Sequence, residues 1–593
     1  MDENNKNFFV ALALSVLVFL VWHFVFVAPK QEAQRLRQQQ EAQLKKEKQE
    51  GTPFAPEAGK TKQPQSPDIV APVVAPKSRE AALADTKRVL IDTPALKGSL
   101  SLKGGRIDDI SFKDYHQSVD KNSPSVELFS PAGSEHPYFA DFGWSSAPIE
   151  GVKFPTTDSE WKVTQGSTLT PSTPITIEYD AGGGVVFQRD ISIDDKYMFS
   201  ITQRVINNST KPLTLAPYGF LWRKNKPYSE SLFISHEGAV GVFDGEVQEE
   251  TYGDLESAKK IDYKAKAGWA GITDKYWASA LIPDQRIAFD ASFRGENGGQ
   301  SPSYQTTYLL NGQNVGPSKT LEVTNRLFAG AKQGRVIEAY AETFKIDKFE
   351  NLIDWGWFHF ITKPLFHVLV YINDMVGNFG FSILIVTVLI KLVLFPLANK
   401  SYKSMAMMKK VQPEMEKIRK RHEKDKMKQQ QALMDLYKKE KINPLSGCWP
   451  ILVQIPIFFA LYKVLYVTIE MRHAPFIGWI KDLSAPDPTS IFNLFGLIPI
   501  DLPLFLMIGI WPIIMGITMY IQMKLNPAPT DPIQAKIFTY MPIVFTFVLA
   551  GFSAGLVIYW AWNNFLSIIQ QYYIMKRHGV EVTLLENMGI KKN

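Results

Sequence analysis

Residues 376–397 read VGNFGFSILIVTVLIKLVLFPL, and this stretch decides the class of fold. From Phe379 to Leu397 it carries a single charge, Lys391, and its length suits a helix that crosses the roughly 30 Å hydrocarbon core of a bilayer. A charged side chain inside a span costs roughly 2.5–3.5 kcal/mol, which makes Lys391 a candidate functional residue by default. The alternative is snorkelling, in which the long side chain lifts its ammonium group to the membrane surface. The sequence therefore predicts a membrane protein with a cation in a span.

The N-terminus supplies a second apolar stretch, from Phe8 to Val27, in which only Ser15 and His23 are polar. We expect it to be an uncleaved transmembrane anchor. A cleaved signal peptide is the alternative, but the candidate cleavage site lacks a small residue three positions before the cut.

The remaining spans follow from the positions of charges and prolines. Residues 537–574 carry no charge, yet a single helix of that length would measure about 57 Å, too long for a bilayer. We therefore divide this stretch at the GFSAG sequence of residues 551–555. With the anchor, six spans are predicted, and the five that follow it are 379–397, 449–468, 503–523, 537–551 and 556–574.

Lysine and arginine counts in the loops predict the orientation. The connection 398–447 carries fourteen of them, whereas 469–502 carries only Arg472 and Lys481. Because cytoplasmic loops are enriched in basic residues, 398–447 is predicted to be cytoplasmic, with both termini inside and residues 28–350 outside. The basic residues between 30 and 48 disagree, but long domains translocate largely regardless of charge.

The region predicted to lie outside is a soluble domain of strands. Residues 31–50 suit a solvated helical stalk, and 51–86 a proline-rich linker. Apolar residues then recur at every second position, as in Val185 and Phe187, between turns rich in Gly, Asn and Asp. Such runs continue to about Phe328 and predict antiparallel strands in a large two-sheet sandwich, closed by a helix near 336–344.

The sequence offers no catalytic constellation. One cysteine, Cys448, excludes a disulfide framework, a multi-thiolate zinc site and an iron–sulfur cluster. The pairs Glu135–His136 and His236–Glu237 could serve as acid and base, although polar loop residues are the preferred interpretation. Without a nucleotide-binding glycine loop or a nucleophile elbow, we predict no enzyme, no metal site and no cofactor.

Residues 351–373, NLIDWGWFHFITKPLFHVLVYIN, are predicted to form a helix in the membrane interface. Aromatic residues beside Lys363 and Pro364 are typical of such helices. The alternative is a helix that packs against the outside domain.

Polar residues inside the spans predict a hydrated cavity. Individually they are typical of interhelical hydrogen bonds. Together, Lys391 as the single buried cation and many amides without a carboxylate describe a wet, positive cavity, and argue against a cation-coupled carrier. These polar residues are Thr387, Gln454, Thr518, Gln522, Thr546, Asn563, Asn564, Ser567, Gln570 and Gln571.

The connection 398–447 is predicted to be a helical hairpin that turns near residues 422–425. Its methionines lie in an apolar stripe flanked by basic residues, which suits either core packing or an adaptable contact with apolar partners. The basic residues would bind anionic lipid heads, and ribosomal RNA is an open alternative. The predicted contact residues are Met405, Met408, Met415, Lys409, Lys410, Arg419 and Arg421.

Several long motifs resemble the YidC membrane protein insertases of Gram-negative bacteria, which are related to the Oxa and Alb insertases of organelles. Beside residues 376–397, they are INPLSGCWPILVQIPIFFALY (442–462), RHAPFIGWIKDLSAPDP (472–488), FSAGLVIYWAWNNFLSIIQQ (552–571) and GWAGITDKYWASALIP (268–283).

The resemblance implies a multi-domain membrane protein: an α-helical bundle of six transmembrane helices, a large periplasmic β-supersandwich dispensable for much of the activity, and a cytoplasmic helical hairpin. The six helices are the N-terminal anchor and a five-helix insertase core. The implied domains are the anchor (1–28), stalk and linker (29–86), β-sandwich (87–346), interfacial helix (347–374), insertase core (375–578) and cytoplasmic tail (579–593).

The resemblance also implies a substrate groove. Lys391 stands where the family has an arginine, so the charge is kept but the bidentate fork is lost. Thr387 and Trp560 fall where the family contacts substrate, and Trp560 replaces a tyrosine. The implied groove residues are Lys391, Thr387, Gln454, Trp560, Asn563, Asn564 and Gln522.

The implied function is a membrane protein insertase and chaperone of the bacterial inner membrane, without a cofactor. The implied partners are nascent membrane proteins, the Sec translocon and lipids, with a ribosome contact left open, and the net charge of +6 gives no argument for DNA. A small-solute transporter or channel and an anchored glycan-binding protein are the alternatives.

Overall fold

The computed structural model describes residues 77–227, 235–296, 301–423, 425–440, 442, 449–496, 498, 508–526 and 532–580. The predicted anchor, the stalk, most of the linker and the tail after residue 580 lie outside these ranges. The described chain divides into two compact units, of which one holds residues 411–442 and the other holds the rest. The larger unit contains a β-domain and a helical core.

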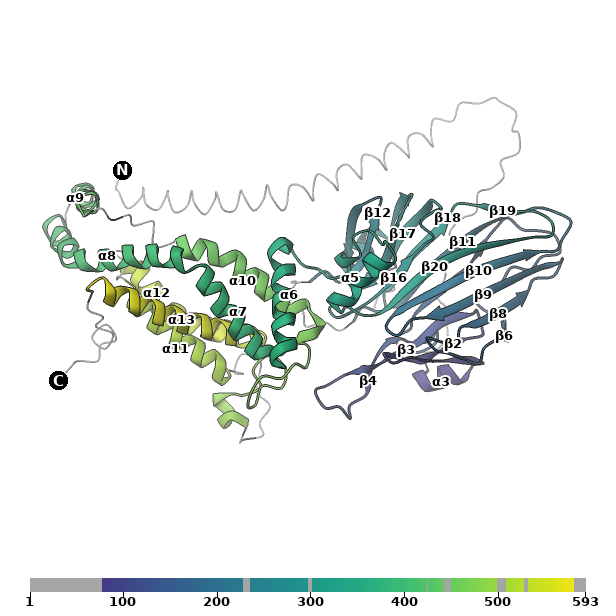
Figure 1. Ribbon diagram of the computed structural model, residues 1–593, viewed down its shortest axis with the longest axis horizontal. Coiled ribbons are helices and arrows are strands. Elements are labelled where there is room, and N and C mark those ends of the chain that lie inside the picture. Colours follow the sequence, from purple (N-terminus) through teal and green to yellow (C-terminus); the bar gives the residue numbers. More distant parts are fainter. Residues whose placement is uncertain are drawn as a thin grey trace, which may run out of the picture. The chain divides into compact units, whose positions relative to one another are not determined.

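Two antiparallel sheets form the β-domain and pack face to face around a shared apolar core (Figure 1). The first has the order β14 (Lys260–Ala265), β17 (Phe289–Glu296), β18 (Ser303–Leu310), β11 (Leu213–Lys224), β5 (Tyr138–Ser145), β3 (Arg106–His116), β2 (Leu96–Ser101), β1 (Arg88–Asp92) and β7 (Thr168–Leu169), of which only β1 and β7 pair in parallel. In addition, β4 (Ser125–Phe129) pairs with β3 and β19 (Gln313–Val315) pairs with β11. The second has the order β13 (Glu246–Thr251), β12 (Gly238–Phe243), β15 (Gly268–Thr273), β16 (Trp277–Ile282), β20 (Lys319–Ala331), β10 (Met198–Asn207), β9 (Val185–Ile193), β8 (Ile175–Asp180) and β6 (Lys162–Gln165).

The alternating sequence pattern matches these strands. In β9, Val185, Phe187, Arg189, Ile191 and Ile193 are buried while the residues between them are half-buried, as expected for a strand with one face on the core. Residues 182–184, all glycines with φ between 60° and 77°, make the turn from β8 to β9, which side chains with a Cβ would resist. The predicted sandwich is confirmed.

Short helices complete the β-domain. They are α3 (Arg79–Ala84), α4 (Tyr252–Ala258), α5 (Gly334–Thr343) and the 3₁₀ turn η2 (Phe349–Leu352). Ile337 and Tyr340 of α5 are buried, as the helical spacing near residues 336–344 predicts.

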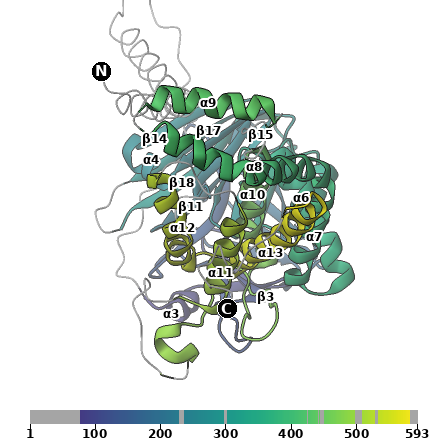
Figure 2. The same cartoon turned by 90° about the vertical axis from the view of Figure 1, so that its left-hand side faces the viewer.

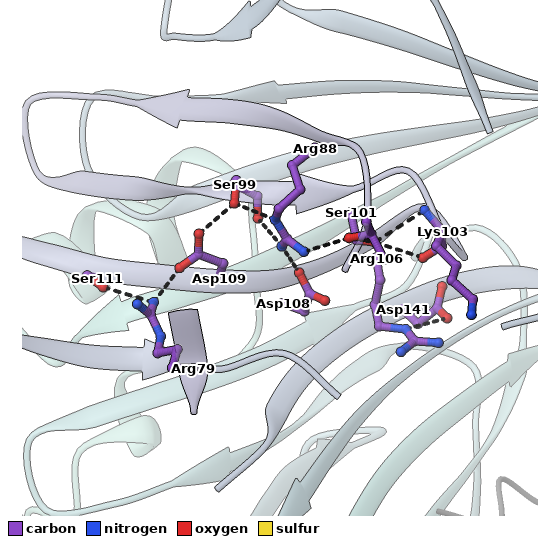
Figure 3. A network of polar contacts seen from close by, with 11 residues as sticks. Arg79, Arg88, Ser99, Ser101, Lys103, Arg106, Asp108, Asp109, Ser111 and Asp141 are labelled. Carbon is purple, nitrogen blue, oxygen red and sulfur yellow. Dashed lines mark hydrogen bonds and ion pairs between the residues drawn. The ribbon is translucent and has the colours of Figure 1, made fainter. Parts of the chain in front are cut away.

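Several charged side chains of the β-domain pair with opposite charges (Figure 3). Arg79 pairs with Asp109 and Arg88 with Asp108. Asp141 lies 3.5 Å from Arg106 and 3.6 Å from Arg189 in the ion pairs that join their side chains. Burial raises the pKa of the Asp141 carboxyl, and both guanidinium groups act against that shift. These charges are compensated within the domain.

The helical core is built around α13 (Ala554–Arg577). Figures 1 and 2 both show α13 between α7 (Phe379–Val393) and α11 (Ile510–Leu525), and it also contacts α10 (Trp449–Val467). The other helices are α6 (His359–Val376), α8 (Phe395–Arg421), α12 (Pro532–Ala550) and the 3₁₀ turns η4 (Ile469–Met471) and η5 (Ile491–Gly496).

Within the described ranges, no single helix has both the length and the apolar composition of a membrane span. The pair α7 and α8 meets that test together, across a bend of 68°. The predicted count of six spans therefore remains a prediction.

The bend corrects the prediction of one continuous helix from 379 to 397. Helix α7 ends at Val393, and Leu394 has φ −85° and ψ 0°. Pro396 is the second residue of α8, a position whose N–H has no partner within the helix, so α8 can begin there. A proline also disfavours a helical conformation in the residue before it, so α7 does not continue into α8 without a bend. Lys391 therefore occupies the last turn of α7, just before the bend.

The predicted division of residues 537–574 is present. Residues 551–553 separate α12 from α13. The first N–H groups of α13 are satisfied from the connection after α10, since Ala554 donates to the Ala485 carbonyl at 2.7 Å and Gly555 to that of Leu483 at 2.9 Å. Helix α12 begins earlier than predicted, at Pro532.

Helix α6 presents two faces. Leu365, Phe366 and Leu369 are buried, whereas Trp357, just before the helix, and Phe360 are each about two-thirds exposed, at 66% and 65%. The aromatic residues of the predicted interfacial helix thus divide between packing and solvent-facing positions, and Trp355 packs on Phe366.

In the unit 411–442, the second part of α8 lies against α9 (Lys426–Lys439). The Tyr437 hydroxyl donates to Met415 Sδ at 3.8 Å, and Gln429 Nε2 donates to the Arg419 carbonyl at 3.3 Å. Contacts in this order are those of two helices running in opposite directions.

Polar contacts join the β-domain to the helical core. Glu470 of η4 accepts a hydrogen bond at 3.1 Å from the N–H of Gly334, the first residue of α5. Lys463 of α10 lies 2.8 Å from Asp354, in the segment between η2 and α6. The connection between the domains is therefore partly ionic.

Candidate functional site

A polar cavity lies among α7, α8, α10 and α13. It has about 40 Å³ of room for the centres of water molecules, which is enough for a few ordered waters. The residues around it are Thr387, Ile390, Lys391, Leu394, Leu397, Ala398, Tyr402, Gln454, Ile457, Tyr559, Asn563 and Gln570. Apolar side chains, amides and hydroxyls therefore line the cavity together.

Lys391 supplies the only positive charge among the residues that line this cavity. Its Nζ donates a hydrogen bond to Ser567 Oγ on α13 at 2.7 Å. Among the described residues, none of the carboxylates lies within 4 Å of this ammonium group. The charge is therefore held by a hydroxyl and compensated by no described acidic group.

Further hydrogen bonds fix the polar side chains of the wall. Ser567 Oγ donates to the Asn563 carbonyl at 2.8 Å, one turn earlier in α13. Tyr402 and Tyr559 also line this wall. Thr387 Oγ1 donates to the Ile383 carbonyl at 2.6 Å, so its proton is used within its own helix.

This arrangement suits the capture of a negative group. A buried ammonium has three N–H donors and no acceptor. The described part of the chain contains no group of three or more His, Cys, Asp or Glu residues that could hold a metal ion. The chemistry available at this site is therefore attraction and hydrogen bonding.

Two family models match the chain. The YidC periplasmic domain matches residues 88–368, and the 60Kd inner membrane protein model matches residues 371–581. A membrane protein insertase YidC of Methylobacterium radiotolerans is 50% identical to it, over 99% of this chain and 97% of the relative. The chain belongs to the YidC family of membrane protein insertases.

Other relatives agree with this assignment. The YidC insertase of Brucella suis biovar 1 is 51% identical, over 99% of this chain and 98% of the relative. The solved structure of an active YidC insertase is 19% identical and covers 84% of this chain and 95% of its own, with a TM-score of 0.36, which is too low to support an argument. Membership of the YidC family rests on the sequence matches.

Four of the seven predicted YidC groove residues line the cavity together: Lys391, Thr387, Gln454 and Asn563. The other three lie elsewhere. Trp560 packs against Phe458, with ring centroids 4.8 Å apart. Asn564 Nδ2 donates to Thr518 Oγ1 at 3.5 Å, and Gln522 is half-buried on α11 away from the cavity.

The sequence interpretation missed two tyrosines of the site. Tyr559 lines the cavity next to the position we assigned to Trp560, and Tyr402 reaches it from α8. The neighbouring aromatic residues at 559 and 560 were a visible signal, but their helical phase was needed to choose between them. Tyr402 lies beyond the predicted span, in the connection where we sought only hairpin contacts.

The interpretation also overlooked a second cation. Lys463 lies inside the predicted span 449–468, so Lys391 is not the single charge in the spans. The two differ in their surroundings, because Lys463 pairs with Asp354.

The predicted hairpin contacts fall into both units. In the larger unit, Met405 and Met408 are half-buried, Lys410 is exposed, and Lys409 Nζ is buried without a described hydrogen-bond partner. In the unit 411–442, Met415 is buried against α9, Arg419 is half-buried and Arg421 is exposed. Packing and an adaptable contact both remain open for the methionines.

Proposed function

We propose that this YidC family member inserts membrane proteins by receiving the polar tail of a nascent span in the cavity around Lys391. The observation that carries the proposal is the ammonium group of Lys391, held by Ser567 and facing no described carboxylate. A buried charge that serves only stability is expected to have a partner.

Attraction would supply the first step. At an effective dielectric of 20, two unit charges at 4 Å attract by about 4 kcal/mol, so an acidic residue of the tail gains by approaching Lys391. Polar walls at Gln454, Asn563 and Tyr559 can exchange hydrogen bonds with the tail backbone. The tail then enters the cavity without leaving its polar groups unsatisfied.

Transfer to lipid would supply the second step. The apolar segment gains roughly 25 cal/mol per Å² when it leaves water for the bilayer. A negative charge that crosses outward gains about 2.3 kcal/mol per 100 mV of membrane potential. These physical terms require no nucleotide and no covalent step.

The proposed setting is the bacterial inner membrane, crossed six times, with both termini in the cytoplasm. The fourteen basic residues of 398–447 support a cytoplasmic position for α8 and α9. The bent pair α7 and α8 supports a span whose cytoplasmic end carries Lys391. The matched periplasmic family model supports an outside position for the β-domain.

The proposed partners are nascent membrane proteins, membrane lipids and the Sec translocon, with the ribosome as a contact of the basic helices. Exposed basic residues of α8 and α9 support contact with anionic lipid heads. Trp560, Asn564 and Gln522 remain proposed substrate contacts, although they lie outside the cavity.

The proposal is tested by insertion in cells depleted of their own insertase. The substrate is a single-span protein with a short tail, made with aspartates in the tail or with asparagines in their place. Lys391→Ala and Lys391→Glu are expected to slow insertion of the aspartate tail by about tenfold or more, equivalent to about 1.4 kcal/mol.

Two further variants complete the test. Lys391→Arg keeps the charge and is expected to retain insertion, and Lys403→Ala removes an exposed lysine of α8 as a matched control. If Lys391→Ala and Lys391→Glu both inserted the aspartate tail at the parent rate, attraction by Lys391 would be the wrong mechanism.

A further inference from the structure

Ser567 is a buried hydrogen-bonding centre beside the cavity. A serine hydroxyl has one proton to donate and two lone pairs that accept. The proton of Ser567 goes to the Asn563 carbonyl at 2.8 Å. Lys391 Nζ, which can only donate, occupies one lone pair at 2.7 Å. The second lone pair is used by neither of these bonds.

This arrangement fixes the Ser567 hydroxyl and leaves the ammonium group with spare donors. One of the three N–H groups of Lys391 is used by Ser567, and no described carboxylate takes the others. Lys391 itself lines the cavity, as do Tyr402 and Asn563. The ammonium group is therefore fixed in place while it can still donate to a second group.

Helix α13 also anchors Lys391 within the core. A free lysine at the end of a span would extend its side chain to the membrane surface, where its charge is hydrated. Ser567 is buried, with 1% of its surface exposed, and belongs to a different helix from Lys391. A hydrogen bond to it opposes that extension and limits the rotamers of a flexible side chain.

We infer that Ser567 is a positioning residue for insertion, which holds the Lys391 ammonium group in the cavity so that it can bind a carboxylate of the incoming tail. The inference rests on the proposed function, since it specifies how the lysine is presented. It assigns to Ser567 a role that its residue type alone would not reveal.

The test uses the full-length protein in depleted cells and the aspartate and asparagine tails described above. Ser567→Ala is expected to slow insertion of the aspartate tail by roughly fivefold, the effect of losing one ordinary hydrogen bond, and to leave the asparagine tail unchanged. Ser567→Thr keeps the hydroxyl and is expected to restore the parent rate.

Ser382→Ala is the matched control. Ser382 is buried on α7 and donates to the Asn378 carbonyl at 3.0 Å, so it makes the same type of bond within its own helix but does not line the cavity. Its loss is expected to affect neither tail. In a Lys391→Ala background, Ser567→Ala should cause no further loss, because the group that it positions is gone.

The outcomes separate the inference from the proposed function. If Lys391→Ala slows the aspartate tail but Ser567→Ala inserts it at the parent rate, or slows both tails equally at normal protein levels, the inference is overturned and the proposed function stands. If Lys391→Ala itself has no effect, the proposed function fails. If Ser567→Ala does not accumulate, Ser567→Cys takes its place, because a thiol is of similar size but accepts hydrogen bonds only weakly. If Ser567→Cys inserted the aspartate tail at the parent rate, the inference would be contradicted.

Discussion

Two arginines of the β-domain and Lys391 of the helical core lie in different surroundings. In the β-domain, Arg223 lies 2.6 Å from Asp274, and Arg189 lies 3.6 Å from Asp141. In the core, Lys391 is bonded to a serine and faces no described acidic group. These arginine charges are thus neutralised by carboxylates, whereas that of Lys391 is left available. Lys332, also in the β-domain, is buried and donates to the Thr273 hydroxyl at 3.0 Å, so the difference follows the partner of each cation.

The difference separates structural from functional charges. A paired charge has already used its attraction within the fold, so its loss is expected to change stability. An unpaired charge that lines a cavity stabilises nothing by attraction, and its loss is expected to change what the cavity binds. A paired lysine also occurs in the core, since Lys463 pairs with Asp354. The partner of a cation, and not the region that contains it, therefore decides whether the charge is structural.

The largest expected effect on stability is that of Asp141→Ala. This change leaves the guanidinium groups of Arg106 and Arg189 buried without their carboxylate. Removing one partner of a buried ion pair typically costs about 3–5 kcal/mol. We expect a loss of that size in the free energy of unfolding of the β-domain, measured by pulse proteolysis in urea.

An exposed ion pair serves as the control for Asp141. Lys77 and Asp85 lie 2.6 Å apart with 45% and 53% of their side chains exposed. Lys77→Ala is expected to cost at most about 1 kcal/mol. Equal losses in the free energy of unfolding for Asp141→Ala and Lys77→Ala would contradict this account. They would show that a buried ion pair contributes no more to stability than an exposed one.

The second prediction concerns pH and Glu470, which lies between the predicted spans and contacts α5. Burial raises the pKa of its carboxyl to about 7. The pKa of this carboxyl is therefore higher in the folded protein than in the unfolded chain. The contribution of Glu470 to the free energy of unfolding is fully present below about pH 4 and is lost as pH rises through about 7. A tenfold change in the proton affinity of one group corresponds to about 1.36 kcal/mol of folding free energy.

We therefore expect the melting temperature of the parent to be higher at pH 5.5 than at pH 8. The difference should be larger for the parent than for Glu470→Gln. The glutamine stays neutral and can still accept the N–H of Gly334. The measurement is the change in melting temperature between the two pH values for both proteins in detergent. A parent and a variant that change in parallel would contradict a role for Glu470.

The third and smallest prediction is for Lys463→Met. It keeps an unbranched side chain but removes the ammonium group that pairs with Asp354. Because Asp354 also accepts the N–H of His236 at 2.8 Å, we expect a loss of about 1.5–3 kcal/mol without an effect on the choice between acidic and neutral tails. Melting and insertion assays check both parts. Loss of tail discrimination would remove the distinction between paired and unpaired lysines.

Much of the fold follows from patterns that one sequence contains. Alternating residues such as those of β9 predict a sandwich because burial repeats every second position in a strand. The division near 551–553 follows from helix length alone. The bend at Leu394 was missed, although Pro396 carried the signal, because we used that proline to end a span rather than to divide one.

The site was predictable only in part. The residue types and the cost of a buried charge were enough to select Lys391. Its partner could not be found, because Ser567 lies 176 positions away and only the packing of α7 against α13 brings them together. Likewise, the choice between Tyr559 and Trp560 depends on the rotation of α13, which hydrophobic spacing does not determine when both neighbours are aromatic.

Charge reversal tests the central claim most directly. A photo-reactive residue at position 387, on the cavity wall, reports contact with the tail of a stalled nascent chain. The account predicts that an aspartate tail crosslinks in the parent, fails to crosslink in Lys391→Glu, and that a lysine tail crosslinks in Lys391→Glu instead. Crosslinking that ignores the sign of both charges would contradict the claim that Lys391 captures acidic residues.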